Sequence, residues 1–156
     1  MPDMLVRLTD LPSALEIVAG RSGEHVLIRR AMTYEQGSIV DWIGKTFSAT
    51  WADECKPAFG SHPVGCFIAA AGERLAGFCC IDCTLRGFAG PVGVAPRWQG
   101  MGIGRALLVA ALHAMKAMGY GYSVIGNVAA PEFFAKAVGA VPIVSGKAEV
   151  YPKTIS

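Results

Sequence analysis

The chain has 156 residues, of which 53% are hydrophobic and 17% are charged, and its formal net charge is +2. This length fits one domain, and the balance of apolar and charged residues excludes an intrinsically disordered chain. The small net charge gives no argument for the strongly basic surface that is typical of nucleic-acid-binding domains.

The first third of the chain is predicted to hold one strand and three helices. Asp10 can cap a short helix that Gly20 ends. Residues 24–32 have the composition of a strand. Apolar residues recur at helical spacing over 39–47, and residues 51–58 fit a second, shorter helix before the next loop.

The middle of the chain is predicted to be an antiparallel meander of three strands. Residues 64–71 form a continuous apolar run, and Gly72 and Glu73 fit a two-residue hairpin turn with glycine first. Residues 75–85 would return antiparallel to that strand, and residues 88–94 would form the third strand.

The last third alternates between helices and strands. Apolar residues follow one helical face over 103–118, and Gly119 is placed to end that helix. A strand at 122–125, a helix at 132–138 and a last strand at 143–151 follow. The expected fold class is therefore α+β (α/β mixed), with a mixed, mostly antiparallel sheet flanked by helices on both faces.

The most informative segment is the glycine-rich turn between the third meander strand and the long helix. Gly100, Gly102 and Gly104 alternate there, so no side chain at these positions blocks a ligand from the backbone. The first N–H groups of a helix have no intrahelical partners, and the helix dipole makes this end positive. The segment 99–105 therefore predicts a site for a phosphate or pyrophosphate group.

Two common phosphate-binding loops do not fit this segment. A P-loop requires G-x-x-x-x-G-K-[S/T], and the chain has no such string. A dinucleotide-binding loop requires G-x-G-x-x-G, but Arg105 stands where the third glycine should be. Gly126 and Asn127 also stand where an acidic residue would follow the next strand.

Two motifs resemble those of the GCN5-related N-acetyltransferase (GNAT) superfamily. Gln99-Gly100-Met101-Gly102-Ile103-Gly104 matches its Q/R-x-x-G-x-G/A signature, and Val94-x-Pro96 precedes it as in the family. Asn127-x-x-Ala130-x-x-Phe133-Phe134-x-Lys136 is similar to the second signature, N-x-x-A-x-x-[L/F]-Y-x-K. The resemblance covers residues 24–151, with residues 1–23 as an N-terminal extension of a single acyltransferase domain at 1–156.

The resemblance implies a sheet that is split around a cleft for acetyl-CoA. The loop would hold the pyrophosphate, the backbone of residues 92–94 would pair with the pantetheine arm and polarise the thioester carbonyl, and Asn127 would bind the arm from the other side. The implied cofactor-binding residues are Val92, Gly93, Val94, Gln99, Gly100, Met101, Gly102, Ile103, Gly104, Arg105, Asn127 and Phe134. No metal is implied.

The catalytic acid and base depart from the family pattern. Phe134 stands where the family often has a tyrosine, and it has no hydroxyl to protonate the leaving thiolate. The third meander strand carries no acidic residue, so Asp82 on the preceding strand is the candidate base, because an apolar environment can raise the pKa of a carboxyl group. The alternative is that Asp82 caps a turn or pairs with Arg86.

Two other groups of residues have both a functional and a structural interpretation. Trp51, Asp53 and Glu54 fall in the segment that walls the acceptor site in this family, where a ring face and a carboxylate could hold a cationic amine. The alternative is core packing for the tryptophan and a solvated face for the acids. Cys80 and Cys83 form a C-x-x-C string, but positions i and i+3 of a strand face opposite ways, which favours packed core thiols over a metal site.

The resemblance implies an acetyl-CoA-dependent N-acetyltransferase that acts on an amine of a small molecule or peptide. The alternative is an acyl-CoA-binding sensor without efficient turnover. We expect no nucleic-acid or membrane partner, and a homodimer is a further expectation. Residues 1–4 lack the features of a signal peptide, and no apolar run reaches the length of a membrane span, so we expect a cytoplasmic location.

Overall fold

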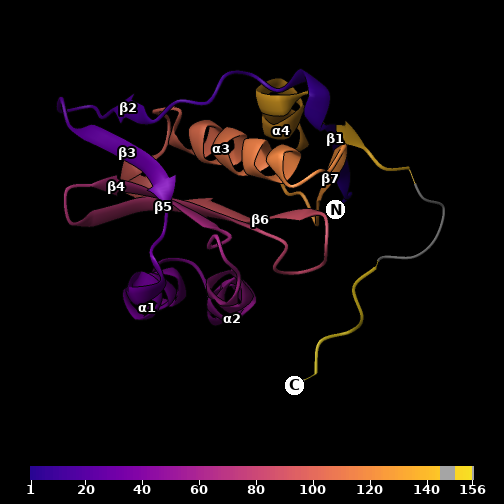
Figure 1. Cartoon of the computed structure of the whole chain (residues 1–156), viewed down its shortest axis with the longest axis horizontal. Helices are drawn as coiled ribbons and strands as arrows, with labels where there is room; N and C mark the ends of the chain where they lie inside the picture. Colours follow the sequence, from indigo (N-terminus) through magenta and orange to yellow (C-terminus); the bar gives the residue numbers. More distant parts are fainter. Residues whose placement is uncertain (145–149, 156) are drawn as a thin grey trace.

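The computed structural model describes residues 1–144 and 150–155, which build an eight-stranded sheet with helices on both faces (Figure 1). The strands are β1 (Met4–Arg7), β2 (Ile17–Ala19), β3 (His25–Arg30), β4 (Cys66–Ala71), β5 (Arg74–Ile81), β6 (Phe88–Val94), β7 (Tyr122–Ile125) and β8 (Val141–Pro142). The α-helices are α1 (Gln36–Thr46), α2 (Ala49–Cys55), α3 (Ile103–Ala117) and α4 (Pro131–Val138). Short 3-10 turns lie at Leu8–Asp10, Thr33–Glu35, Lys56–Gly60 and Pro96–Trp98.

The strand order is β2-β3-β4-β5-β6-β7-β1-β8. Every described pair is antiparallel except β6 with β7, which is parallel. The expected mixed, mostly antiparallel sheet is therefore confirmed. The parallel pair joins the strand that precedes the glycine-rich turn to the strand that comes after α3.

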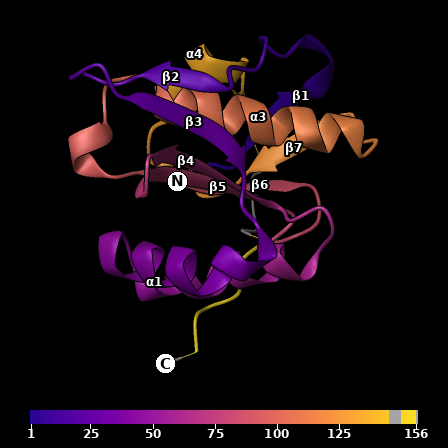
Figure 2. The same ribbon diagram turned by 60° about the vertical axis from the view of Figure 1, so that its left-hand side comes forward.

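The helices form one layer on each face of the sheet. Figure 1 shows α1 and α2 below the strands and α3 and α4 above them, and Figure 2 shows the same separation of α1 from α3 after rotation. The apolar core is divided accordingly into a larger cluster that includes α3 and a smaller one under α1 and α2. Ile103, Leu107, Ala111 and Met115 recur every four residues and are all buried, so the long amphipathic helix is confirmed.

The meander β4-β5-β6 is also confirmed. The β4–β5 turn begins at Gly72, whose φ of +61° is a conformation that glycine adopts without strain. In β4 and β5 nearly every residue is buried, because helices cover both faces of these strands. This explains why their sequences are continuous apolar runs and show no alternation.

The predicted helix between Asp10 and Gly20 is wrong. Residues 11–16 form no helix, and residues 17–19 are strand β2, which pairs with β3. Strand β1 at 4–7 lies just before the predicted helix and pairs with β7. Met4, Val6 and Leu8 are buried at every second position, which is the period of a strand. The hairpin that residues 17–19 form with β3 therefore overrides the local capping signals. The segment expected as an extension supplies two strands of the same sheet.

The predicted last strand at 143–151 is also wrong where the structure describes it. The final strand, β8, is short and lies earlier, at Val141–Pro142, beside β1. Residues 143–144 and 150–151 are not in a strand, and residues 145–149 lie outside the described residues. The apolar composition of this region reflects exposed valine and isoleucine side chains, Ile143, Val144 and Val150 among them.

Candidate functional site

The glycine-rich loop leads directly into the first turn of α3. Gly100 and Gly102 have φ values of +81° and +83°, and Gly102 is the N-cap of the helix. Within the described residues, the backbone N–H groups of 100–105 donate to no other group of the protein. Because α3 has 15 residues, its dipole adds positive potential at this end. The loop therefore has the geometry of an anion site.

Two contacts hold this loop against β6. The side-chain amide of Gln99 donates to the carbonyl oxygen of Val94 at 3.1 Å. A Cβ added at Gly104 would lie 3.4 Å from the Val94 side chain, so the first turn of α3 is in van der Waals range of the end of the strand. Arg105 is exposed in the first turn of the helix, beside the free N–H groups. The end of β6 and the start of α3 thus form one continuous surface.

The sheet opens between β6 and β7 next to this loop. The two strands pair only at Phe88 with Val124 and at Ala89 with Ile125. On the β5 side, Cys79 pairs with Val92 and Ile81 pairs with Ala89. One residue of β5 but two residues of β6 lie between these pairs, so β6 has a bulge of one extra residue. Such a bulge bends a strand and ends its pairing. In the part of the chain that the structure describes, residues 90–94 therefore have no strand partner on the β7 side.

Both faces of β6 near its end are covered, so its open edge is the accessible part. A Cβ at Gly93 would lie 2.8 Å from the Phe47 ring and 3.0 Å from the Trp51 ring. These rings belong to an aromatic cluster with Trp42 and Phe78, whose centroids are 5.3 to 6.4 Å apart. On the opposite face, the side chains of residues 92 and 94 pack against the core around α3. Among the described residues, the open edge is therefore the side of this stretch that no other element covers.

Two neighbouring phenylalanines of α4 have different surroundings. Phe134 is 8% exposed and belongs to the core, whereas Phe133 is 40% exposed. The rings pack edge to face with centroids 5.0 Å apart. A Cβ at Gly104 would lie 3.5 Å from Phe133, so Phe133 is the ring beside the first turn of α3. Motif spacing selects Phe134, and it cannot show which of two adjacent rings faces a cleft.

The far side of the opening is shaped by residues from both ends of the chain. Asn127 has a φ of +52°, and its backbone N–H donates to Asp3 Oδ1 at 2.8 Å. The Tyr151 hydroxyl donates to the same oxygen at 3.3 Å and contacts Gly126, while its ring packs edge to face on Phe88. Burial and the neighbouring Asp3 raise the pKa of Tyr151 to about 12. The sequence carried no signal for the Tyr151 contact.

Asp82 lies in the turn after β5, with a φ of +54°. Its carboxylate accepts hydrogen bonds from the Gly87 N–H at 2.7 Å and from the Tyr120 hydroxyl at 3.0 Å. Burial, together with this hydrogen bond to the carboxylate, raises the pKa of the Tyr120 hydroxyl. These contacts are those of the turn-capping alternative, and they hold the meander against the end of α3.

We expect Asp82→Ala to lower the free energy of unfolding by about 1–3 kcal/mol, because the Gly87 N–H and the Tyr120 hydroxyl lose a charged acceptor. Asp82→Asn should lose less stability, since the asparagine side-chain oxygen can still accept a hydrogen bond at the same position and asparagine tolerates positive φ. Urea denaturation of both variants measures this difference. If Asp82 acted as a general base, Asp82→Asn would instead lose acetyl transfer at unchanged stability.

The three residues expected on the acceptor side do not converge. Trp51 is part of the aromatic cluster on β6. Asp53 is exposed and forms an ion pair with Lys56 at 2.5 Å. Glu54 accepts a hydrogen bond from the Thr84 hydroxyl, which ties α2 to the β5–β6 turn.

The cysteines gather more closely than the strand period predicted. The Cys80 thiol lies beside those of Cys55, Cys66 and Cys83, and these neighbours together with burial raise its pKa. Cys83 reaches the same side as Cys80 because β5 ends at Ile81 and the chain then turns. All five thiols are free. Among the described residues, no group of three or more histidine, cysteine or acidic side chains is arranged to hold a metal ion.

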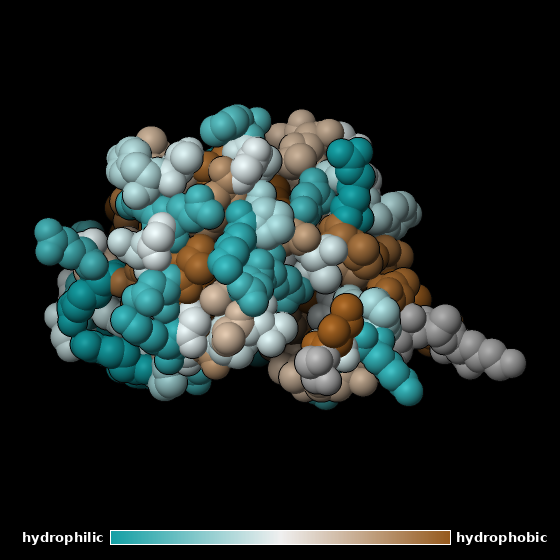
Figure 3. Space-filling view, turned by 90° about the horizontal axis from the view of Figure 1, so that it is seen from below, coloured by the Kyte–Doolittle hydropathy of each residue, from teal (hydrophilic) through white to brown (hydrophobic). Residues whose placement is uncertain are grey.

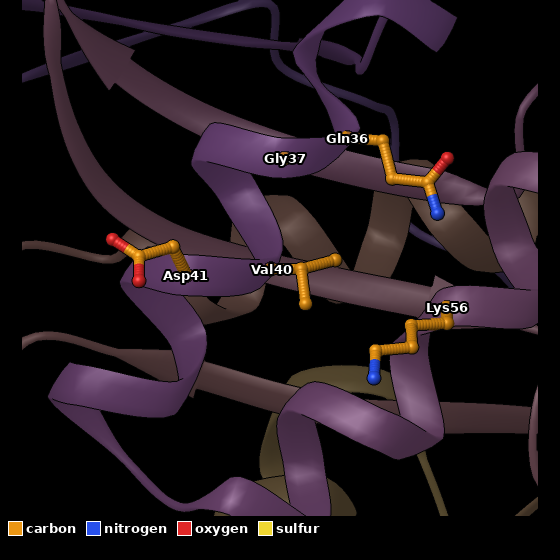
Figure 4. Close-up of a pocket in the computed structure, with 5 residues that line it drawn as sticks. All are labelled: Gln36, Gly37, Val40, Asp41 and Lys56. Carbon is orange, nitrogen blue, oxygen red and sulfur yellow. The ribbon is translucent and has the colours of Figure 1, made fainter.

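A separate open groove lies between α1 and the end of α2. Its volume is about 470 Å³, and it is lined by Gln36, Gly37, Val40, Asp41 and Lys56 (Figure 4). Figure 4 shows the Asp41 carboxylate turned away from Lys56. Both charges are already paired, Asp41 with Lys45 at 2.8 Å and Lys56 with Asp53. The groove is thus on the outer side of the helices, and none of the loop residues lines it.

The face that α1 and α2 present is mostly hydrophilic. Figure 3 shows this face from below, with hydrophobic atoms gathered mainly toward its right-hand side. The described residues include no helix long and apolar enough to cross a membrane.

Comparison with known proteins places these features in a family. Residues 37–140 match the model of the acetyltransferase (GNAT) family. The structure resembles the GCN5-related glucosamine N-acetyltransferase region of a fungal multi-domain GH3 beta-N-acetylglucosaminidase, with a TM-score of 0.70 and 15% identity over 91% of this chain and 19% of that one. No curated protein sequence matches significantly.

Two further solved structures share the fold. A GCN5-related N-acetyltransferase from Sphaerobacter thermophilus has a TM-score of 0.62 and 19% identity over 91% of this chain and 48% of that one. A GNAT family acetyltransferase from Brucella melitensis, solved with acetyl-CoA, has a TM-score of 0.52 and 21% identity over 71% and 82%. The chain spans half or less of the length of the first two proteins.

Proposed function

Because the chain belongs to the acetyltransferase (GNAT) family, we propose that it transfers the acetyl group of acetyl-CoA to an amine of a small molecule or peptide. The observation that carries this proposal is the row of free N–H groups at residues 100–105, which lies next to the open edge of β6. One ligand that is anionic at one end and amide-bearing along its length satisfies both features. Acetyl-CoA has this chemistry.

The proposed binding mode uses the backbone more than side chains. The pyrophosphate would accept hydrogen bonds from the loop 99–105, and the pantetheine amides would pair with residues 92–94 as an added strand. Asn127 lies across the opening with its side chain unengaged among the described residues. We assign the aromatic contact near the loop to Phe133, with Phe134 packed behind it in the core.

The chain's contribution to the transfer would be orientation and polarisation. Acetyl-CoA supplies the activated acyl group. Backbone N–H groups on the open edge of β6 would donate to the thioester oxygen and stabilise the negative charge that develops when the amine attacks. The amine must be neutral to attack, and holding it against the thioester is itself a large part of the rate enhancement. As the new C–N bond forms and the C–S bond breaks, the nitrogen gives up one proton and the departing thiolate takes up one, so transfer to the neutral amine releases no net proton.

We place the acceptor on the α2 side of the opening. Glu54, held by Thr84, would offer a carboxylate that binds the amine in its cationic form before it loses the proton and attacks, and Trp51 would limit how far the acceptor reaches along β6. Asp53 would act only at the rim, because it is exposed and already paired with Lys56. The alternative of an acyl-CoA sensor without turnover gains no support from the family match. Whether the chain dimerises stays a prediction.

A thermal melt tests the cosubstrate. Acetyl-CoA at 100 times its dissociation constant should stabilise the fold by about 2.7 kcal/mol, which raises Tm by roughly 5–11 °C at this chain length. ATP and NAD serve as controls, because they also carry phosphates but no pantetheine arm. A shift with all three ligands, or with none, would contradict the proposed binding mode.

A further inference from the structure

Arg21 connects the N-terminal hairpin to the glycine loop. It lies in the turn between β2 and β3, and its guanidinium donates to the carbonyl oxygen of Gln99 at 2.5 Å and to that of Arg97 at 3.2 Å. A Cβ at Gly100 would lie 3.1 Å from its Nη2 atom. The side chain therefore packs directly on the loop, 76 to 78 residues away in the sequence.

The turn is shaped to present Arg21 at its tip. The Gly20 N–H donates to the Glu24 carbonyl oxygen at 2.8 Å, and the Ser22 N–H donates to the Glu24 carboxylate at 3.0 Å. Gly23 adopts a φ of +82°. These contacts close a tight hairpin, so the position of Arg21 is fixed by backbone hydrogen bonds as well as by its own contacts.

Arg21 affects the loop in two ways. By binding the carbonyls of residues 97 and 99, it engages oxygen atoms whose partial negative charge would repel an anion. A guanidinium also has five N–H donors, and two contacts leave some of them free. Arg74 and Arg97 lie nearby, both over the ring of Trp98 at 5.5 and 5.1 Å. Backbone hydrogen bonds lower the pKa of the Glu24 carboxylate in the same hairpin, and Arg74 and Arg97 are close enough for their charges to lower it further. Three arginines thus accompany one acid on this side of the loop, which leaves it net positive.

We propose that Arg21 is a positioning residue of the phosphate site, which fixes the loop carbonyls and contributes its charge to the phosphate groups of acetyl-CoA. The inference rests on the proposed function. It adds a part of the chain that the family match does not include, since that match begins at residue 37. The group that Arg21 would contact is a phosphate of acetyl-CoA, either in the pyrophosphate or at the 3′ position of the ribose.

The test compares Arg21→Met and Arg21→Lys with the wild type, and Arg7→Met is the matched control. Arg7 is an exposed arginine of β1 that pairs with Asp10 at 2.7 Å. Dissociation constants are measured by calorimetry for CoA and for 3′-dephospho-CoA. Initial rates of thioester consumption, with a panel of amines as acceptors, give kcat and KM for acetyl-CoA and for acetyl-pantetheine, which lacks phosphoadenosine and pyrophosphate.

We expect Arg21→Met to weaken CoA binding by about tenfold or more, the loss typical of one hydrogen-bonded charged group. KM for acetyl-CoA should rise, kcat should stay unchanged, and kcat/KM for acetyl-pantetheine should not fall. Arg21→Lys should recover part of the affinity, because lysine keeps the charge but not the planar fork. If Arg21→Met loses the same factor in affinity for CoA and for 3′-dephospho-CoA, Arg21 contacts the pyrophosphate. If it loses affinity for CoA alone, Arg21 contacts the 3′-phosphate.

Two results would overturn this inference while leaving the proposed function intact. One is wild-type affinity for CoA in Arg21→Met. The other is a fall in kcat/KM for acetyl-pantetheine as large as the fall for acetyl-CoA, which would show that Arg21 only supports the fold. A wild-type protein that does not bind CoA would overturn the proposed function, and this inference with it.

Discussion

Gly102→Glu is expected to abolish acetyl-CoA binding while the chain still folds. Gly102 is the N-cap of α3 with a φ of +83°, and a Cβ there would meet no atom within 4 Å. The new side chain therefore fits sterically, at a cost of about 1–3 kcal/mol for the left-handed backbone. Its carboxylate would stand among the free N–H groups where the pyrophosphate is expected, and it would both compete with and repel that group.

The control for this prediction is Gly102→Ala, which carries the same backbone strain without the charge. Calorimetry with acetyl-CoA and a thermal melt without ligand separate binding from folding. We expect the alanine variant to retain measurable affinity, with both variants melting at similar temperatures. Wild-type affinity in Gly102→Glu would refute the assignment of the loop to the phosphates.

Gly93→Val is expected to disturb the strand that would hold the thioester. A Cβ at this position would lie 2.8 Å from Phe47 and 3.0 Å from Trp51, closer than packed side chains approach. The aromatic cluster or β6 must therefore move, and overpacking of this kind costs about 1–3 kcal/mol. Because β6 also forms the open edge, acetyl transfer should fall beyond what the loss of stability explains.

A second substitution distinguishes steric pressure from other effects at Gly93. Phe47→Leu shortens the side chain that meets the new valine, so the double variant Gly93→Val with Phe47→Leu should regain part of the activity. Gly37→Ala is the matched control, since a Cβ there meets nothing within 4 Å and the residue lies in α1. Full activity in Gly93→Val would show that β6 is not the reacting strand.

The local part of this architecture could be predicted from the sequence. The meander and α3 have apolar patterns that depend only on near neighbours, and the glycine loop combines a local turn with a helix start. The element at 10–20 was predicted wrongly because residues 17–19 form strand β2 through their pairing with β3, and the pairing of β1 with β7 was not foreseen at all. Local capping residues carry no information about such distant partners.

The same limit applies to the candidate site. The loop residues 99–105 were identifiable because their chemistry is carried by contiguous backbone. Arg21 was not, because its contacts with residues 97 and 99 depend on the position of a hairpin in the folded sheet. The different environments of Phe133 and Phe134 also depend on the rotation of α4 against α3, which motif spacing does not specify.

The pairing of β1 with β7 has a consequence for how the chain is made. Met4–Arg7 pairs with Tyr122–Ile125. During synthesis β1 therefore cannot form this pairing until more than a hundred further residues have left the ribosome. Such long-range contacts slow folding, because a large loop must close before they form. Meanwhile Met4, Val6 and Leu8, which are buried in the finished sheet, stay uncovered. The nascent chain would therefore expose these apolar residues until α3 and β7 emerge, and this is the stage at which its N-terminal strand is most open to aggregation.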